Sequence, residues 1–253
     1  MQDKKLKMTR IELKGVWKLS KNCAIIVAAG KGSRMGFDIN KVFIEIGEKP
    51  IIQYSLECFE SHPDIDEIVL VAKLNEIEKF QHIIKSNNMK KVKKIVVGGN
   101  TRRESVVNAL SVIKDSDVVV IHDGARPFIS HDLISKGIKY ANKYGACTCG
   151  VTPKDTIKVK DKLNFIKESL NRDFLISVQT PQSFKYKLIW EGHNHKIDEN
   201  INITDDTSLM EYLGHNVFVY NGEYTNIKIT TKEDLIFAEE FVKKFNNVKN
   251  SLT

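Results

Sequence analysis

Three glycines and two cations stand within the segment Gly30–Gly36, whose sequence is GKGSRMG. The segment follows the uncharged run Cys23–Ala29, whose β-branched centre is typical of a strand covered on both faces in a parallel sheet. Glycines let a phosphate approach backbone N–H groups, and Arg34 could add a charged, two-pronged donor. The spacing fits neither a dinucleotide fingerprint nor a Walker A loop. The segment therefore predicts a triphosphate-binding loop, with an ordinary tight turn as the alternative.

A carboxylate and further cations occur at two other places. Asp123 follows the apolar run VVVI and His122, which puts it at the carboxyl end of a predicted strand, where open α/β sheets bind ligands. Its carboxylate is a typical Mg²⁺ ligand, and Arg126 could reach a phosphate. The alternative for this pair is a helix-capping aspartate beside a surface arginine. Lys41 stands in the run INKVF near apolar residues, and it could either bind phosphate or simply extend its charge into solvent.

Alternating strands and helices are expected to bring these loops together. The pattern predicts strands at 23–29, 67–72, 94–97, 117–122 and 216–220, and helices at 51–61, 75–86, 103–114, 186–192, 206–213 and 232–245. Strand–helix–strand repeats of this kind form parallel crossovers, so we expect one α/β domain at 23–245. The run from Ala146 alternates like a hairpin with a polar turn at 160–164, and it predicts an arm at about 150–172 that leaves the sheet.

Composition and charge limit the class of protein. The chain has 253 residues, 42% of them hydrophobic, enough for one substantial core, and it contains no apolar run long enough to cross a membrane. We therefore expect a soluble protein with no membrane partner. The formal charge is +7, but the lysines are scattered and not interleaved with aromatic residues, which argues against a nucleic acid partner.

The two ends of the chain and its cysteines predict little chemistry. Residues 1–22 form a basic extension that is either simply solvated or a targeting segment, and 246–253 form a tail. The cysteines show neither a CxxC pair nor zinc-ligand spacing. We expect them to be reduced core residues of a cytoplasmic protein. They are Cys23, Cys58, Cys147 and Cys149.

Eight short motifs occur in order: AAGKGSRMG, NKVF, GGNTRRESV, HDGARPF, KDTIK, TPQSF, ITDDTSLMEY and NIKIT. Together they resemble the 2-C-methyl-D-erythritol 4-phosphate cytidylyltransferases of the non-mevalonate isoprenoid pathway, over about residues 23–245. The resemblance implies a Rossmann-like, mainly parallel sheet of the nucleotidyltransferase type, with a protruding β-arm used in dimerisation. It also implies transfer of CMP from CTP to a sugar-alcohol phosphate, with release of pyrophosphate.

Two alternatives to that activity stay open. Ribitol-5-phosphate cytidylyltransferases share most of these motifs, although VAAGKG and HDGARP are closer to the isoprenoid enzymes, so D-ribitol 5-phosphate is the alternative acceptor. A module that binds a nucleotide or nucleic acid without turnover is a third possibility. So many convergent charges argue against it, because binding alone does not need them.

Carried over residue by residue, the resemblance implies a complete site. The catalytic cations are Arg34, Lys41 and Lys228. The nucleotide-binding residues are Ala28, Ala29, Gly30, Gly32, Gly99, Asn100, Ser105 and Gly124. Asp123 is the ligand of an Mg²⁺ cofactor, and acceptor binding falls to Arg126, Thr156 and Arg172. Because Thr156 and Arg172 are in or beside the arm, which in this family completes the partner's site across a two-fold axis, the resemblance also implies a homodimer.

The chain departs from the family pattern at several positions. Asn40 stands where many members have proline, and Asn100 stands where aspartate is common. Asp205 and Asp206 precede a predicted helix, and we expect them to cap it rather than to bind metal.

Overall fold

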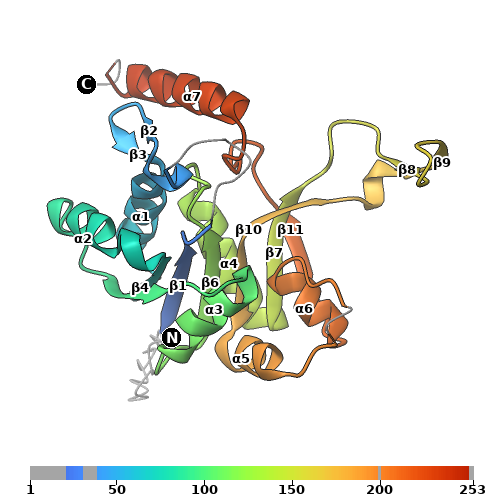
Figure 1. The fold of residues 1–253 in the computed structure, drawn as a ribbon, viewed down its shortest axis with the longest axis horizontal. Helices are drawn as coiled ribbons and strands as arrows, with labels where there is room; N and C mark the ends of the chain where they lie inside the picture. Colours follow the sequence, from blue (N-terminus) through green and yellow to red (C-terminus); the bar gives the residue numbers. More distant parts are fainter. Residues whose placement is uncertain (1–20, 31–38, 199–200, 251–253) are drawn as a thin grey trace, which may run out of the picture.

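The computed structural model describes residues 21–30, 39–198 and 201–250, with side chains to residue 244. One seven-stranded sheet forms its centre (Figure 1). Its strands are β1 (Asn22–Val27), β4 (Glu67–Ala72), β5 (Val92–Val97), β6 (Val118–Asp123), β7 (Ala146–Val151), β10 (Ser177–Lys185) and β11 (Phe218–Asn221). They lie in the order β11-β7-β10-β6-β1-β4-β5, and β10 is antiparallel to both of its neighbours while the other pairs are parallel. The expected α/β fold with a mainly parallel sheet is confirmed.

Helices cover both faces of the sheet. They are α1 (Ile51–Ser61), α2 (Ile77–Ser86), α3 (Arg102–Ser111), α4 (His131–Tyr144), α5 (Tyr186–Asn194), α6 (Asp206–Tyr212) and α7 (Lys232–Asn250). Apolar side chains of α1, α2 and α4 share one core cluster with the sheet, and those of α3, α5 and α6 share another. Two short strands, β2 (Glu45–Ile46) and β3 (Lys49–Pro50), form a separate hairpin, and α7 packs beside it in a third, smaller cluster. Each predicted helix is present, and the last runs to Asn250, past its expected end at 245.

The arm begins later than the sequence predicts. The hairpin pattern that begins at Ala146 places the start of the arm near residue 150, but the segment Ala146–Val151 is β7, a buried strand between β10 and β11. Its small side chains suit a position that is covered on both faces. The arm therefore comprises residues 152–176, with the antiparallel strands β8 (Lys158–Lys160) and β9 (Ile166–Ser169) near its tip. Figure 1 shows it extending away from the main sheet.

The cysteines agree with the expected reduced core. All four are free thiols, and Cys23, Cys147 and Cys149 are buried. Burial raises the pKa of Cys147 and Cys149 to about 12, so they are neutral thiols at physiological pH. Within the described ranges no helix has both the length and the apolar character that a bilayer span requires.

Candidate active site

A cavity of about 570 Å³ lies beside the carboxyl ends of β1, β5 and β6. Six separate segments of the chain meet around it. The predicted site residues that line it are Ala28, Ala29, Gly30, Lys41, Gly99, Asn100, Ser105, Asp123 and Lys228. Gly124 directly follows Asp123, and its N–H donates to the carbonyl of Val27. Gly32 and Arg34 lie outside the described residues.

The loop after β5 is folded by its own side chains. The N–H of Gly99 donates to the Ser105 hydroxyl over 3.1 Å, and that hydroxyl donates to the Thr101 carbonyl over 2.9 Å. Thr101 in turn caps the first turn of α3. A Cβ on Gly98 would lie 2.5 Å from the Cβ of Ala29, so glycine is needed for the two loops to approach this closely. Backbone of both loops therefore lines one cavity.

Three cations surround the carboxylate of Asp123 at the end of β6. Lys228 Nζ lies 2.7 Å from its Oδ2, Arg126 Nε lies 3.9 Å from the same oxygen, and Arg102 Nε lies 3.7 Å from Oδ1. Burial opposes ionisation of Asp123, but Lys228 and Arg102 outweigh it and hold the pKa of this carboxyl well below its usual range. Asp123 is thus a permanent anion inside the cavity wall.

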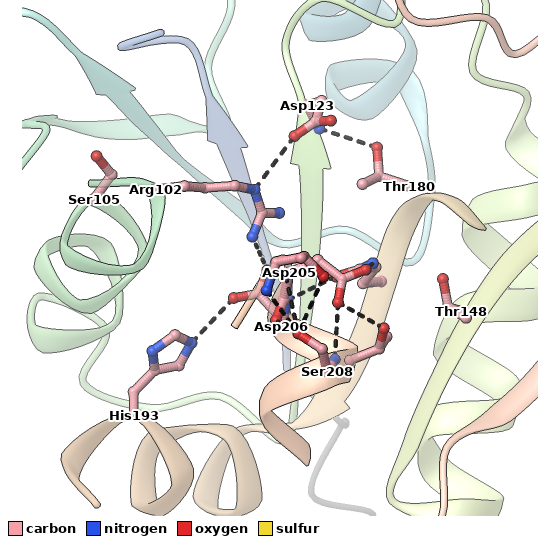
Figure 2. Close-up of polar contacts among 12 residues, drawn as sticks. Arg102, Ser105, Asp123, Thr148, Thr180, His193, Asp205, Asp206 and Ser208 are labelled. Atoms are coloured by element: carbon pink, nitrogen blue, oxygen red, sulfur yellow. Dashed lines mark hydrogen bonds and ion pairs between the residues drawn. The ribbon is translucent and has the colours of Figure 1, made fainter. Parts of the chain in front are cut away.

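Arg102 joins Asp123 to a second buried carboxylate (Figure 2). Its NH1 group lies 2.6 Å from Oδ2 of Asp206, whose side chain is 1% exposed. The other oxygen of Asp206 lies 3.1 Å from Nε2 of His193. Burial opposes ionisation of Asp206, and Arg102 and His193 reverse that effect, so its pKa falls below the usual value. The chain of contacts therefore runs from α5 through α6 and α3 to the end of β6.

The two aspartates at the start of α6 have different roles. Asp205 is the expected cap, because its carboxylate accepts from the Ser208 N–H over 2.8 Å and Ser208 bonds back to the Asp205 backbone. It also accepts from the Gln182 amide on β10 over 2.7 Å. The expectation that Asp206 is a cap is wrong, since it lies in the first turn and pairs with Arg102.

Comparisons with known proteins decide the family. A family model named IspD and described as 2-C-methyl-D-erythritol 4-phosphate cytidylyltransferase matches residues 22–244. The chain belongs to this family. Proteins of that name from Clostridium novyi and Clostridium kluyveri are 52% and 53% identical over 226 residues, which cover 89% of this chain and 98% of each relative. The crystal structure of 4-diphosphocytidyl-2C-methyl-D-erythritol synthase from Anaerococcus prevotii has a TM-score of 0.79 at 34% identity, covering 88% of this chain and 96% of that one.

The cytidylyltransferase fold buries the expected acceptor residue Arg126. Its side chain is 11% exposed, and NH1 donates to the carbonyl of Asn226 over 2.8 Å. His122 supports it, with Nε2 3.1 Å from the Arg126 carbonyl. Burial lowers the pKa of His122 to about 4, which keeps this ring neutral at physiological pH. The alternative of a surface arginine beside a helix cap is therefore wrong.

The predicted acceptor residues Thr156 and Arg172, like Arg126, do not line the cavity of their own chain. Thr156 and Arg172 are both exposed residues of the arm, and the guanidinium of Arg172 donates to the Lys154 carbonyl over 2.7 Å.

The cavity lining also contains three charged or amide side chains that the sequence motifs did not single out: Asn40, Lys73 and Arg102. Arg102 stands inside the motif GGNTRRESV, so the sequence already placed it near the site. Its partner Asp206 lies 104 residues later, and no local sequence pattern joins the two. Lys73 follows β4, and a lysine after a strand does not by itself indicate a binding residue.

Proposed function

We propose that this chain transfers CMP from CTP to 2-C-methyl-D-erythritol 4-phosphate, and that the reaction takes place in the cavity beside Asp123. An oxygen of the acceptor phosphate would form a bond to the α-phosphorus of CTP. The bond between that phosphorus and the bridging oxygen of the β-phosphate would break, and the electron pair would leave with pyrophosphate. The products are pyrophosphate and 4-diphosphocytidyl-2-C-methyl-D-erythritol.

The observation that carries the proposal is the convergence of backbone loops and cations on one cavity in a member of this family. Lys41 and Lys228 come from segments nearly 190 residues apart and both line it. Two anionic substrates must be held together for this reaction, so their mutual repulsion has to be offset by fixed positive charge. No covalent nucleophile is required, because the acceptor phosphate itself attacks.

The remaining lining residues suit a nucleotide. We assign the base to Gly99, Asn100 and Ser105, where a small pocket would admit a pyrimidine and polar groups would recognise the exocyclic amino group of cytosine. Gly124 would lie near the ribose. The backbone at 28–30 and the cations would hold the triphosphate, together with Gly32 and Arg34 in the glycine-rich sequence that follows.

The site also fits an Mg²⁺ cofactor bound largely through its substrate. The described residues contain no group of three or more histidine, cysteine or acidic side chains that could hold a metal by themselves. Mg²⁺ commonly takes one or two protein carboxylates and completes its shell with phosphate oxygens and water, so the ionised carboxylate of Asp123 is a suitable ligand. When bound, the ion would neutralise part of the triphosphate charge.

We further propose that the enzyme is a homodimer in which the arm completes the partner's site. Large apolar side chains are exposed along the arm: Leu163, Phe165, Ile166 and Phe174, at 66–86% exposure. Large apolar side chains that are exposed on one protruding arm support an interaction site there. A second copy covering it would bring Thr156 and Arg172 to an acceptor phosphate. The free thiols support a reducing compartment, and we assign the enzyme to the cytoplasm.

The test of the reaction is pyrophosphate release from CTP and Mg²⁺ with each candidate acceptor in parallel. We expect release with 2-C-methyl-D-erythritol 4-phosphate and none with D-ribitol 5-phosphate. Release with the ribitol compound alone would overturn the assignment of the acceptor. No release with either, despite measurable CTP binding, would overturn the proposed reaction.

The test of the arm is complementation between two inactive variants. Arg172→Ala damages the arm and Lys228→Ala damages the cavity. In an arm-exchanged heterodimer one of the two sites has both parts intact, so an equal mixture should recover about a quarter of wild-type sites. If the mixture stays as inactive as its components while heterodimers form, the arm does not complete the partner's site.

A further inference from the structure

Asn40 occupies a buried position just before the short 3-10 helix Lys41–Phe43. Its side-chain amide donates two hydrogen bonds, to the Ala28 carbonyl at the end of β1 over 2.8 Å and to Oε2 of Glu76 over 2.9 Å. Its side-chain oxygen accepts from the Val42 N–H over 3.4 Å. The amide and the oxygen of this side chain therefore both make hydrogen bonds. Together these bonds hold the backbone from which the next residue, Lys41, extends its side chain.

Glu76 is the anchor on the other side. It ends the short 3-10 helix Leu74–Glu76 that leads into α2, and it is 7% exposed. Its second oxygen lies 3.5 Å from Nζ of Lys73, which also lines the cavity. A buried carboxylate is costly unless it is paired, and hydrogen bonds to it are stronger than those between neutral groups. The carboxylate of Glu76 therefore ties two separate segments of the cavity wall together through Asn40 and Lys73.

We propose that Asn40 and Glu76 are positioning residues that hold Lys41 in place for catalysis. The inference rests on the proposed role of Lys41 at the triphosphate. A lysine ammonium is a point charge on a flexible four-carbon stem, so its position depends on the backbone from which it starts. Misplacing a catalytic group by about 1 Å can cost 10²-fold in rate. A backbone held by a strand end and a buried carboxylate limits that error.

A double-mutant cycle separates positioning from general stability. Asn40→Ala should lower kcat/KM for CTP by about tenfold or more in the wild-type enzyme, and by less than about twofold in an enzyme that already carries Lys41→Ala. A purely structural loss would appear in both backgrounds. If Asn40→Ala does not fold, Glu76→Ala replaces it, and its effect on kcat/KM is measured with and without Lys41→Ala. Circular dichroism confirms that each variant in the comparison is folded.

Two further variants sharpen the cycle. Glu76→Gln retains an oxygen that can accept from Asn40, so turnover should stay within about threefold of wild type. Gln53→Ala is the matched control, because Gln53 on α1 is also buried and does not line the cavity. Its amide donates to Glu57 on α1 over 2.8 Å and to Asn87 at the end of α2 over 2.9 Å. Gln53→Ala should lower stability and leave kcat/KM unchanged.

The outcomes distinguish this inference from the proposed function. If Lys41→Ala turns over like the wild type, the role of Lys41 is wrong and the inference fails with it. If Lys41→Ala is impaired but Asn40→Ala lowers kcat/KM equally in both backgrounds, or not at all, only the positioning role is overturned.

Discussion

Replacing Asp206 by asparagine tests the buried contacts between α6 and the end of β6. The substitution keeps the shape of the side chain but removes the charge that faces Arg102 at 2.6 Å. Breaking a buried ion pair by neutralising one partner costs about 3–5 kcal/mol. Asparagine retains one oxygen that can accept from Arg102, and Arg102 still has Asp123 at 3.7 Å, so we expect the free energy of unfolding to fall by about 2–3 kcal/mol.

The matched control is Asp205→Asn, one residue earlier. It removes the same charge and keeps an oxygen for the N-cap, but it loses the oxygen that accepts from the Gln182 amide, so the free energy of unfolding should fall by about 1 kcal/mol. Urea denaturation at neutral pH measures the free energy of unfolding of both variants. In 1 M NaCl the difference between the two variants should stay the same, because salt screens buried ion pairs only little. If Asp206→Asn costs no more than Asp205→Asn, the contact with Arg102 contributes nothing to stability and the reasoning fails.

Three other substitutions test individual parts of the site. Lys228→Ala should lower kcat/KM by about 10²–10³-fold, because it removes a charge beside the reacting phosphates. It should cost only about 1 kcal/mol of stability, because the ion pair with Asp123 is partly exposed. Turnover at the wild-type rate would refute the role of Lys228. His122 has a pKa of about 4 in the folded protein and about 6.5 in the unfolded chain. Its contribution to stability is therefore complete above pH 6.5 and is lost as the pH falls towards 4, at up to about 1.4 kcal/mol per pH unit. If the urea midpoint of His122→Gln depends on pH as the wild-type midpoint does, this reasoning is contradicted. Gly124→Ala would place a Cβ 2.6 Å from Cδ1 of buried Ile52 and should lower stability by about 1–3 kcal/mol, which an unchanged thermal midpoint would disprove.

Most of the fold could be predicted because its signals are local. Helix α1 has Ile52, Leu56 and Phe59 at helical spacing, and all three are fully buried as that spacing requires. The error at β7 has an equally physical cause. The sequence CTCGV alternates between small apolar and polar residues, which suits a half-exposed hairpin as well as a strand with Thr148 bonded to the Gln179 carbonyl inside the protein. Only the tertiary partner β10 decides between them.

The site could be predicted where a residue lies at the end of its own strand. Asp123 is such a residue, because strand periodicity alone places it at the ligand edge of the sheet. The partners of Arg102 and Asn40 could not be found in this way. Asp206 and Glu76 are 104 and 36 residues distant from them, and a carboxylate before a helix looks like a cap whether or not an arginine reaches it. Such pairs can be identified only from the tertiary structure, in which helices and strands distant in the sequence pack together.

The geometry around Asp123 also shows which of its cations can turn towards a substrate. Arg102 is held by the buried Asp206, and moving it would leave that carboxylate without its charge partner. Arg126 is the least exposed of the three and is bound to a main-chain carbonyl. Lys228 has 36% of its side chain exposed, compared with 28% for Arg102 and 11% for Arg126. We therefore expect Lys228 to exchange Asp123 for a phosphate at the smallest cost in desolvation, while the two arginines keep that carboxylate ionised.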